Sequence, residues 1–189
     1  MRHALDISCG AIRLVAADTT TFDAPGAYAD ALARVSEERR KKALSFRFEK
    51  DRRVSLLAGL LLNDLLSERG LAERDMEYVT GPHGKPAFAK EPGLHFSLAH
   101  SGLMAAAALA PFPVGVDIER LDGFPRDIAD PQAWTAMEGV GKATGQGIGA
   151  YVDAGVETFS VPAGFRVEHY SCDGYLVCLA FDGLAATLV

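Results

Sequence analysis

The 189-residue sequence predicts an α+β fold of two similar halves that join near residues 103–113. The predicted order of elements is strand, helices, strands, and then strand, helix, strands. The chain is 49% hydrophobic and 23% charged, which suits one ordinary globular unit or two small subdomains that share a core. No run of residues is long and apolar enough to span a bilayer.

Periodicity and capping predict the elements of the first half. Residues 11–18 alternate as a strand, and Ser36 is a typical N-cap for a helix over EERRKKAL. Residues 49–70 predict the clearest helix, which ends at Gly70 and carries an apolar stripe at Val54, Leu57, Leu61 and Leu65. A strand at 76–80, a turn at 81–88 and two paired strands within 94–110 complete this half.

The second half repeats this order with one helix. Residues 114–119 predict a strand, and residues 120–131 a loop. Asp130 and Pro131 are typical of the N-cap and first position of a helix, which runs to Gly145. The alternating segments 165–170 and 175–181, with a Cys-Asp-Gly turn between them, predict a β-hairpin.

Charge and cysteine content limit the function and the compartment. With a net charge of -6 and a pI near 5.3, the chain is a poor general binder of nucleic acid or of anionic membranes. The N-terminus lacks the apolar segment of a secretory signal. Cys9, Cys172 and Cys178 are odd in number and show no metal-ligand spacing, so we expect free thiols in a reducing cytoplasm.

The segment PVGVDIERL, residues 113–121, places two carboxylates close enough to repel each other. Asp117 and Glu119 share one face of the predicted strand, where each raises the pKa of the other. A divalent cation such as Mg²⁺ would remove the repulsion. The alternative is a solvated strand edge, which is the commoner reading of an isolated Asp-x-Glu. Glu138 supplies a third acid, four residues before Lys142 on one helix face, although this spacing alone favours a surface ion pair.

Basic residues cluster between residues 39 and 53 of this acidic chain. The only acidic residues in that stretch are Glu49 and Asp51. As a cluster they suit a polyanionic ligand, while each one singly fits a solvated helical face. The cluster consists of Arg39, Arg40, Lys41, Lys42, Arg47, Lys50, Arg52 and Arg53. Lys85, in a Gly-Lys-Pro turn, and His100, at a strand end, are further candidates.

Four motifs in this order carry a family resemblance: GPHGKPAF, LHFSLAHSG, PVGVDIERL and WTAMEGVGKATG. Together with FRFEKDRRVSLLAG they resemble the 4'-phosphopantetheinyl transferases, and most closely the larger, monomeric type that activates peptide and polyketide synthases. The resemblance spans about residues 36–145. It implies a pseudo-dimer of two α+β subdomains, 1–108 and 109–189, with the active site in the cleft between them, and a monomer in solution.

The same resemblance implies an activity and a site. The enzyme would transfer the 4'-phosphopantetheine group of coenzyme A to a serine of an apo acyl or peptidyl carrier protein and release 3',5'-ADP. Asp117, Glu119 and Glu138 would hold Mg²⁺ at the pyrophosphate, and Glu138, directly or through a metal-bound water, would take the serine proton. The implied catalytic residues are Asp117, Glu138 and Lys142, and the implied coenzyme A contacts are Arg39, Lys42, Lys85, Pro86 and His100.

The sequence also departs from the family pattern. Ala99 replaces a serine of the histidine motif, Met137 a lysine, and Val54 a common basic residue. Residues 120–133, between Glu119 and Trp134, form a shorter segment than is usual in the family. These departures keep open a second hypothesis, a family member that binds coenzyme A or a carrier protein without transfer.

Overall fold

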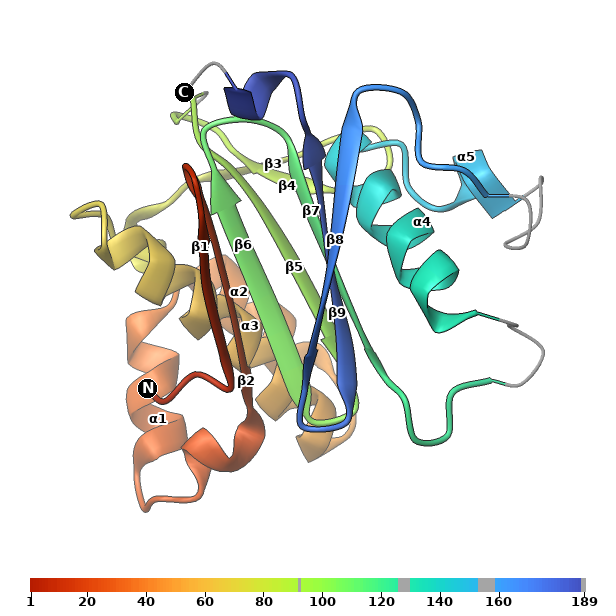
Figure 1. The fold of residues 1–189 in the computed structure, drawn as a ribbon. Helices are drawn as coiled ribbons and strands as arrows, with labels where there is room; N and C mark the ends of the chain where they lie inside the picture. Colours follow the sequence, from red (N-terminus) through yellow and green to blue (C-terminus); the bar gives the residue numbers. More distant parts are fainter. Residues whose placement is uncertain (92, 126–129, 153–158, 188–189) are drawn as a thin grey trace.

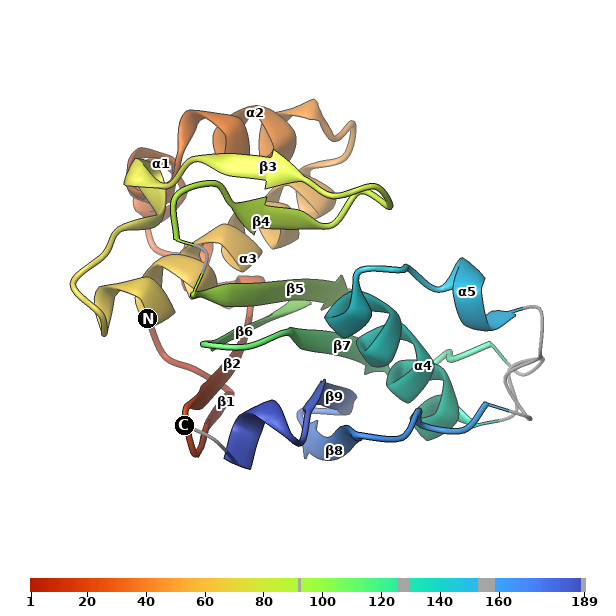
Figure 2. The ribbon, with the colours of Figure 1, turned by 90° about the horizontal axis from the view of Figure 1, so that it is seen from above.

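A four-stranded antiparallel sheet forms the centre of the first half. Figure 1 shows it in a computed structural model that describes residues 1–91, 93–125, 130–152 and 159–187. In spatial order, the strands are β1 (Leu5–Cys9), β2 (Ile12–Asp18), β6 (Met104–Ala110) and β5 (His95–Ser101). Helix α3 (Glu49–Ser67) packs on this sheet, and α1 (Ala27–Arg34) and α2 (Glu37–Ser45) pack on α3 (Figure 2). A short hairpin of β3 (Tyr78–Thr80) and β4 (Pro86–Phe88) lies beside α2.

The second half is a smaller sheet with one long helix. Its strands, in spatial order, are β7 (Val114–Arg120), β9 (Tyr175–Asp182) and β8 (Phe165–Cys172). Helix α4 (Pro131–Thr144) packs on β7 and β9, and the short α5 (Gly149–Val152) follows it. Strand β7 runs next to β5, so this pair of strands joins the two halves (Figure 2).

The hydrophobic core forms layers on both sides of the first sheet. In β6, Ala105, Ala107 and Leu109 pack with α3. The alternate β6 residues, Met104 and Ala106 among them, pack with β7 and β9. Because both faces of β6 are buried, its sequence is an apolar run rather than an alternating one. A third, smaller cluster lies between α4 and the second sheet.

The two halves share one connectivity. Strand β2 is followed by α3, β5 and β6 and pairs with β6, which pairs with β5. In the same way β7 is followed by α4, β8 and β9 and pairs with β9, which pairs with β8. This α+β arrangement confirms the predicted fold class and is consistent with a pseudo-dimer. The division into 1–108 and 109–189 stays a prediction; β6 continues to Ala110.

The predicted long elements are confirmed. Helix α3 ends in the expected left-handed glycine: Gly70 has φ +73°, and the Leu71 N–H donates to the Leu66 carbonyl oxygen at 3.0 Å. Asp173 and Gly174, both with positive φ, make the turn of the β8–β9 hairpin. All three cysteines are free thiols. Residues 126–129 of the predicted loop lie outside the described residues.

Candidate functional site

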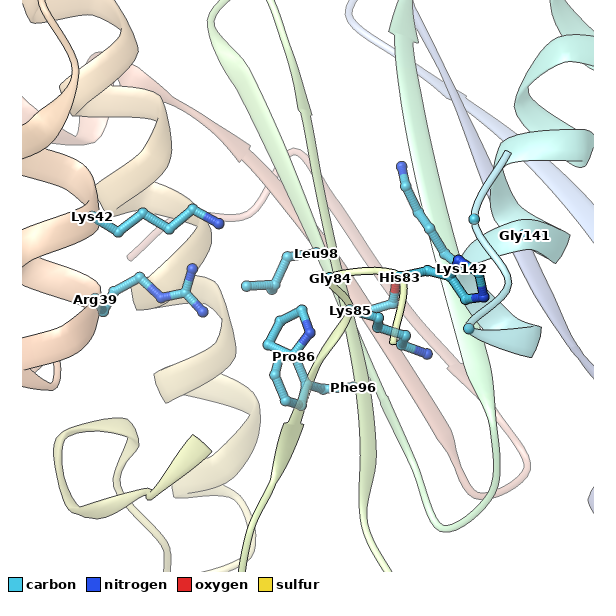
Figure 3. Close-up of a pocket in the computed structure, with 13 residues that line it drawn as sticks. Arg39, Lys42, His83, Gly84, Lys85, Pro86, Phe96, Leu98, Gly141 and Lys142 are labelled. Atoms are coloured by element: carbon cyan, nitrogen blue, oxygen red, sulfur yellow. The ribbon is translucent and has the colours of Figure 1, made fainter. Parts of the chain in front are cut away.

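Five of the predicted site residues line one cavity of about 250 Å³. Figure 3 shows Arg39 and Lys42 extending from α2 toward the turn that carries Lys85 and Pro86, with Lys142 of α4 on the other side. Among the described residues, the ionisable side chains in this lining are these four cations and His83. The cavity therefore suits an anion, because Arg and Lys pair with phosphate and carboxylate groups.

The α2 wall of the cavity is fixed by a cap. Ser36 accepts a hydrogen bond from the Arg39 backbone N–H at 3.2 Å, which starts α2 as the sequence predicts. Arg39 is buried, whereas Lys42, one turn later, is exposed and has no ion-pair partner among the described residues. Loss of hydration and the neighbouring charge of Arg39 lower the pKa of Lys42.

The turn between β3 and β4 places Lys85 inside the cavity. The Gly81 N–H donates to the Lys85 carbonyl oxygen at 2.9 Å, which closes the turn. The Lys85 ammonium donates to the carbonyl oxygen of Val114 at 3.1 Å, at the start of β7. Burial lowers the pKa of Lys85 to about 8. This lysine thus connects the hairpin of the first half to the sheet of the second.

An acidic pair shares one ammonium beside the cavity. The Lys142 Nζ lies 2.6 Å from Asp117 Oδ1 and 3.2 Å from Glu138 Oε2. Asp117 is only 4% exposed, and burial raises its pKa to about 6, although Lys142 lowers it in part. Burial tends to lower the pKa of Lys142, but the charges of Asp117 and Glu138 outweigh this and raise it. Lys142 therefore lines the cavity and also contacts both acids.

Glu119 and His100 lie near this pair but outside the cavity lining. Glu119 accepts a hydrogen bond from the Ser101 hydroxyl at 2.8 Å, at the end of β5. His100 is exposed, and its pKa is lowered by loss of hydration and by the charges of Lys142 and Lys42. The charged groups that act on His100 are thus two lysines of the cavity and, in the opposite sense, Asp51.

The predicted acids do not form a ready metal cluster. Within the described ranges, no three His, Cys, Asp or Glu side chains lie close enough together to hold a metal ion. Asp117 Oδ2, however, is buried without a hydrogen-bond partner among the described residues. An unpartnered carboxylate oxygen beside a second acid is a donor set that a hard cation such as Mg²⁺ accepts, so these residues fit such an ion.

Two glycines let α4 pack closely on its neighbours. A Cβ on Gly139 would lie 3.1 Å from Cys178 Sγ, and one on Gly141 would lie 2.9 Å from the backbone of Gly147. The Gly139 contact brings α4, which carries Glu138 and Lys142, close to β9, whereas the Gly141 contact is with the segment that follows α4.

Comparison with known proteins independently supports the family resemblance seen in the sequence motifs. No protein-family model matches the chain. It is 33% identical over 97 residues to the 4'-phosphopantetheinyl transferase ffp of Bacillus subtilis, and 38% over 97 residues to psf-1 of Bacillus pumilus. It is also 31% identical over 96 residues to Sfp of Bacillus subtilis strain 168. These matches cover 50–51% of this chain and 42–43% of each relative.

Over the matched half, the chain is similar to these 4'-phosphopantetheinyl transferases. The match spans less than half the length of each relative, so this similarity does not by itself extend their activity to the chain. In the structure, the cavity lining brings together Arg39, Lys42, Lys85, Pro86 and Lys142. Their individual roles, like those of the three acids and His100, stay predictions.

Three residues that depart from the motifs the sequence resembles are core residues. Val54 is 2% exposed in the core under α3, and Ala99 is 7% exposed in the core between the sheets. Met137 is fully buried in α4. The apolar residue at each of these positions contributes to core packing.

Sequence patterns did not single out three residues that shape this site. Ser97 and Ser101 of β5 bond to β7, and Glu73 is a fully buried carboxylate beside Arg39. The two serines share one face of a strand, a signal that the alternation of LHFSLAHSG already carries. Glu73 lies in a polar segment, ERD, with no periodicity that sets it apart.

Proposed function

We propose that this protein transfers 4'-phosphopantetheine from coenzyme A to a serine of an apo acyl or peptidyl carrier protein. The position of Lys142 is the observation that carries this proposal. Its ammonium lines the cationic cavity and also contacts Asp117 and Glu138. Phosphoryl transfer needs phosphate-binding cations next to acidic groups, because positioning and electrostatics supply most of its catalysis.

The transfer breaks one P–O bond and forms another. The serine Oγ attacks the phosphorus that bears the pantetheine arm, and the bond from this phosphorus to the bridging oxygen breaks. 3',5'-ADP leaves with the electron pair of that bond. Glu138, half-buried within 3.2 Å of the Lys142 ammonium, takes the serine proton. Lys142 and Lys85 neutralise charge on the phosphates, and Arg39 and Lys42 pair with the 3'-phosphate.

Magnesium dependence is part of the proposal. Asp117, Glu119 and Glu138 would hold the ion, and the unpartnered Oδ2 of Asp117 supports this assignment. A bound Mg²⁺ would neutralise charge on the pyrophosphate.

A protein that binds coenzyme A without transfer is the second candidate. Two observations favour it. The chain matches less than half the length of its relatives, and Lys142 lies against the acids that transfer needs. Such a protein would retain the cationic cavity but form no product with any metal.

Intact-mass spectrometry of apo carrier proteins tests the proposal. Fatty-acid, polyketide and peptide carriers are incubated with this protein, coenzyme A and Mg²⁺. We expect a phosphopantetheine mass gain that EDTA prevents. Asp117→Ala should abolish it, whereas Glu77→Gln, which changes an exposed carboxylate, should not. No gain on any carrier, together with measurable coenzyme A binding, would favour the second candidate instead.

A further inference from the structure

A buried carboxylate outside the proposed reaction lies behind the cavity. Glu73, in the short 3-10 helix Glu73–Asp75, is 0% exposed. It accepts hydrogen bonds from the Ser36 N–H at 2.6 Å, the Ser36 hydroxyl at 3.0 Å and the Tyr78 hydroxyl at 2.6 Å. Buried carboxylates are rare unless they are paired, so this network calls for an explanation.

The same carboxylate lies behind Arg39. Its Oε1 is 3.7 Å from Arg39 Nε, and the Arg39 guanidinium lies 5.9 Å from the centre of the Tyr78 ring. The Arg39 stem packs against Gly59, where a Cβ would lie 2.7 Å from Arg39 Cγ. Arg39 is therefore confined by a carboxylate, a ring and a helix backbone, and its guanidinium extends into the cavity (Figure 3).

We infer that Glu73 is a positioning residue that orients Arg39 toward a phosphate monoester in the cavity. This inference rests on the proposed function, in which the monoester is the 3'-phosphate of coenzyme A. A guanidinium that is already oriented loses less conformational freedom on binding, which raises affinity for the group it meets. Glu73 would thereby set the preference of the site for coenzyme A over its 3'-dephospho form.

If Glu73 had only a structural role, its replacement would change the 3'-phosphate preference in the opposite direction. Removal of its negative charge would reduce repulsion toward a bound anion and leave the 3'-phosphate preference unchanged or larger. If Glu73 orients Arg39, its loss must instead reduce that preference. In Glu73→Gln the amide oxygen can still accept one of the Ser36 hydrogen bonds, but the NH₂ only donates and the negative charge beside Arg39 is lost.

Isothermal titration calorimetry with coenzyme A and 3'-dephospho-coenzyme A tests the inference in the full chain. The readout is the ratio of the two dissociation constants within each variant. We expect Glu73→Gln to reduce the wild-type ratio about tenfold, as the loss of a charge-assisted contact does. Tyr78→Phe removes one hydrogen bond to Glu73 and keeps the ring, so its ratio should fall by less. Ile12→Val, a core change between the two sheets, should leave the ratio unchanged.

The possible outcomes separate this inference from the proposed function. Wild-type protein that binds neither ligand would overturn both. Wild-type protein that binds coenzyme A without preference for the 3'-phosphate, or an unchanged or larger ratio in Glu73→Gln, would overturn only the role of Glu73. If Glu73→Gln fails to fold in a thermal melt, Tyr78→Phe decides, and an unchanged ratio there overturns the inference.

Discussion

Gly115 of β7 and Gly139 of α4 touch backbone to backbone. A Cβ on Gly115 would lie 1.9 Å from the Gly139 carbonyl oxygen and 2.6 Å from the Ala143 backbone nitrogen. No side-chain rotation can relieve a contact with backbone atoms. The distance between the helix and the strand is thus set by the absence of a side chain at residue 115, and this distance places Lys142 on Asp117.

Gly115→Ala should therefore push α4 away from β7. We expect a loss of about 3 kcal/mol in the free energy of unfolding, at the upper end of overpacking costs. Denaturant melts measure it, and loss of carrier modification should accompany it. Gly149→Ala is the matched control, because a Cβ there meets no atom within 4 Å. Equal stability of the two variants would contradict the close contact.

Lys142→Met should make the stability of the protein depend on a divalent cation. The change leaves Asp117 buried without its counter-charge, which costs about 3 kcal/mol when one partner of a buried pair is removed. We expect Mg²⁺ to raise the melting temperature of this variant more than that of the wild type, and EDTA to reverse the rise. Lys41→Met, which breaks an exposed pair with Glu37, controls for the loss of a lysine. A Mg²⁺ response equal to that of the wild type would argue against a cation at Asp117.

Lys85 should make anion binding depend on pH. Below its pKa of about 8 the ammonium is charged and attracts phosphate, and above it the neutral amine does not. The affinity for coenzyme A should therefore fall as the pH rises from 7 to 9, with a limiting slope of about tenfold per pH unit for one proton. Calorimetry across this range measures it. Lys85→Met should reduce the slope, whereas Lys90→Met, on the exposed surface, should retain it.

Ser97→Ala should weaken the junction of the two halves. The Ser97 hydroxyl accepts the Val116 N–H at 3.0 Å in a fully buried setting. Without it a buried donor is left unpaired, which costs about 1–3 kcal/mol. We expect a lower melting temperature and faster hydrogen exchange at the Val116 amide. Ser171→Ala, at an exposed position of β8, should change neither. Unchanged exchange at Val116 would show that this bond does not hold the junction.

The sequence predicted those elements whose signals are local. The stripe of α3, the Ser36 and Asp130 caps and the Asp173–Gly174 turn depend on neighbours within a few residues, and all four are confirmed. Strand β1 and helix α1 were missed. The strand has five residues at the sheet edge, and the helix starts at Gly26 with no side-chain cap and buries only Ala31. Their stability comes from tertiary packing, which no local pattern reports.

The candidate site was predictable in composition but not in arrangement. Motif order singled out Arg39, Lys85 and Lys142, which the fold brings to one cavity from three separate elements. It could not reveal that Lys142 lies against Asp117, because that contact depends on how closely α4 sits on β7. Motif order also could not distinguish Glu73 from acidic residues on the surface, because the hydrogen-bond partners of Glu73 come from the start of α2 and from β3.

If the cavity binds an anion and Asp117 binds a cation, the position of Lys142 would make the two binding events interdependent. An anion that draws its ammonium into the cavity removes the counter-charge of Asp117, and so raises the affinity of that carboxylate for a cation. By thermodynamic reciprocity, a cation at Asp117 frees Lys142 and strengthens the binding of the anion by the same factor. A single flexible side chain would therefore make the loading of the two ligands cooperative, with no movement of the backbone.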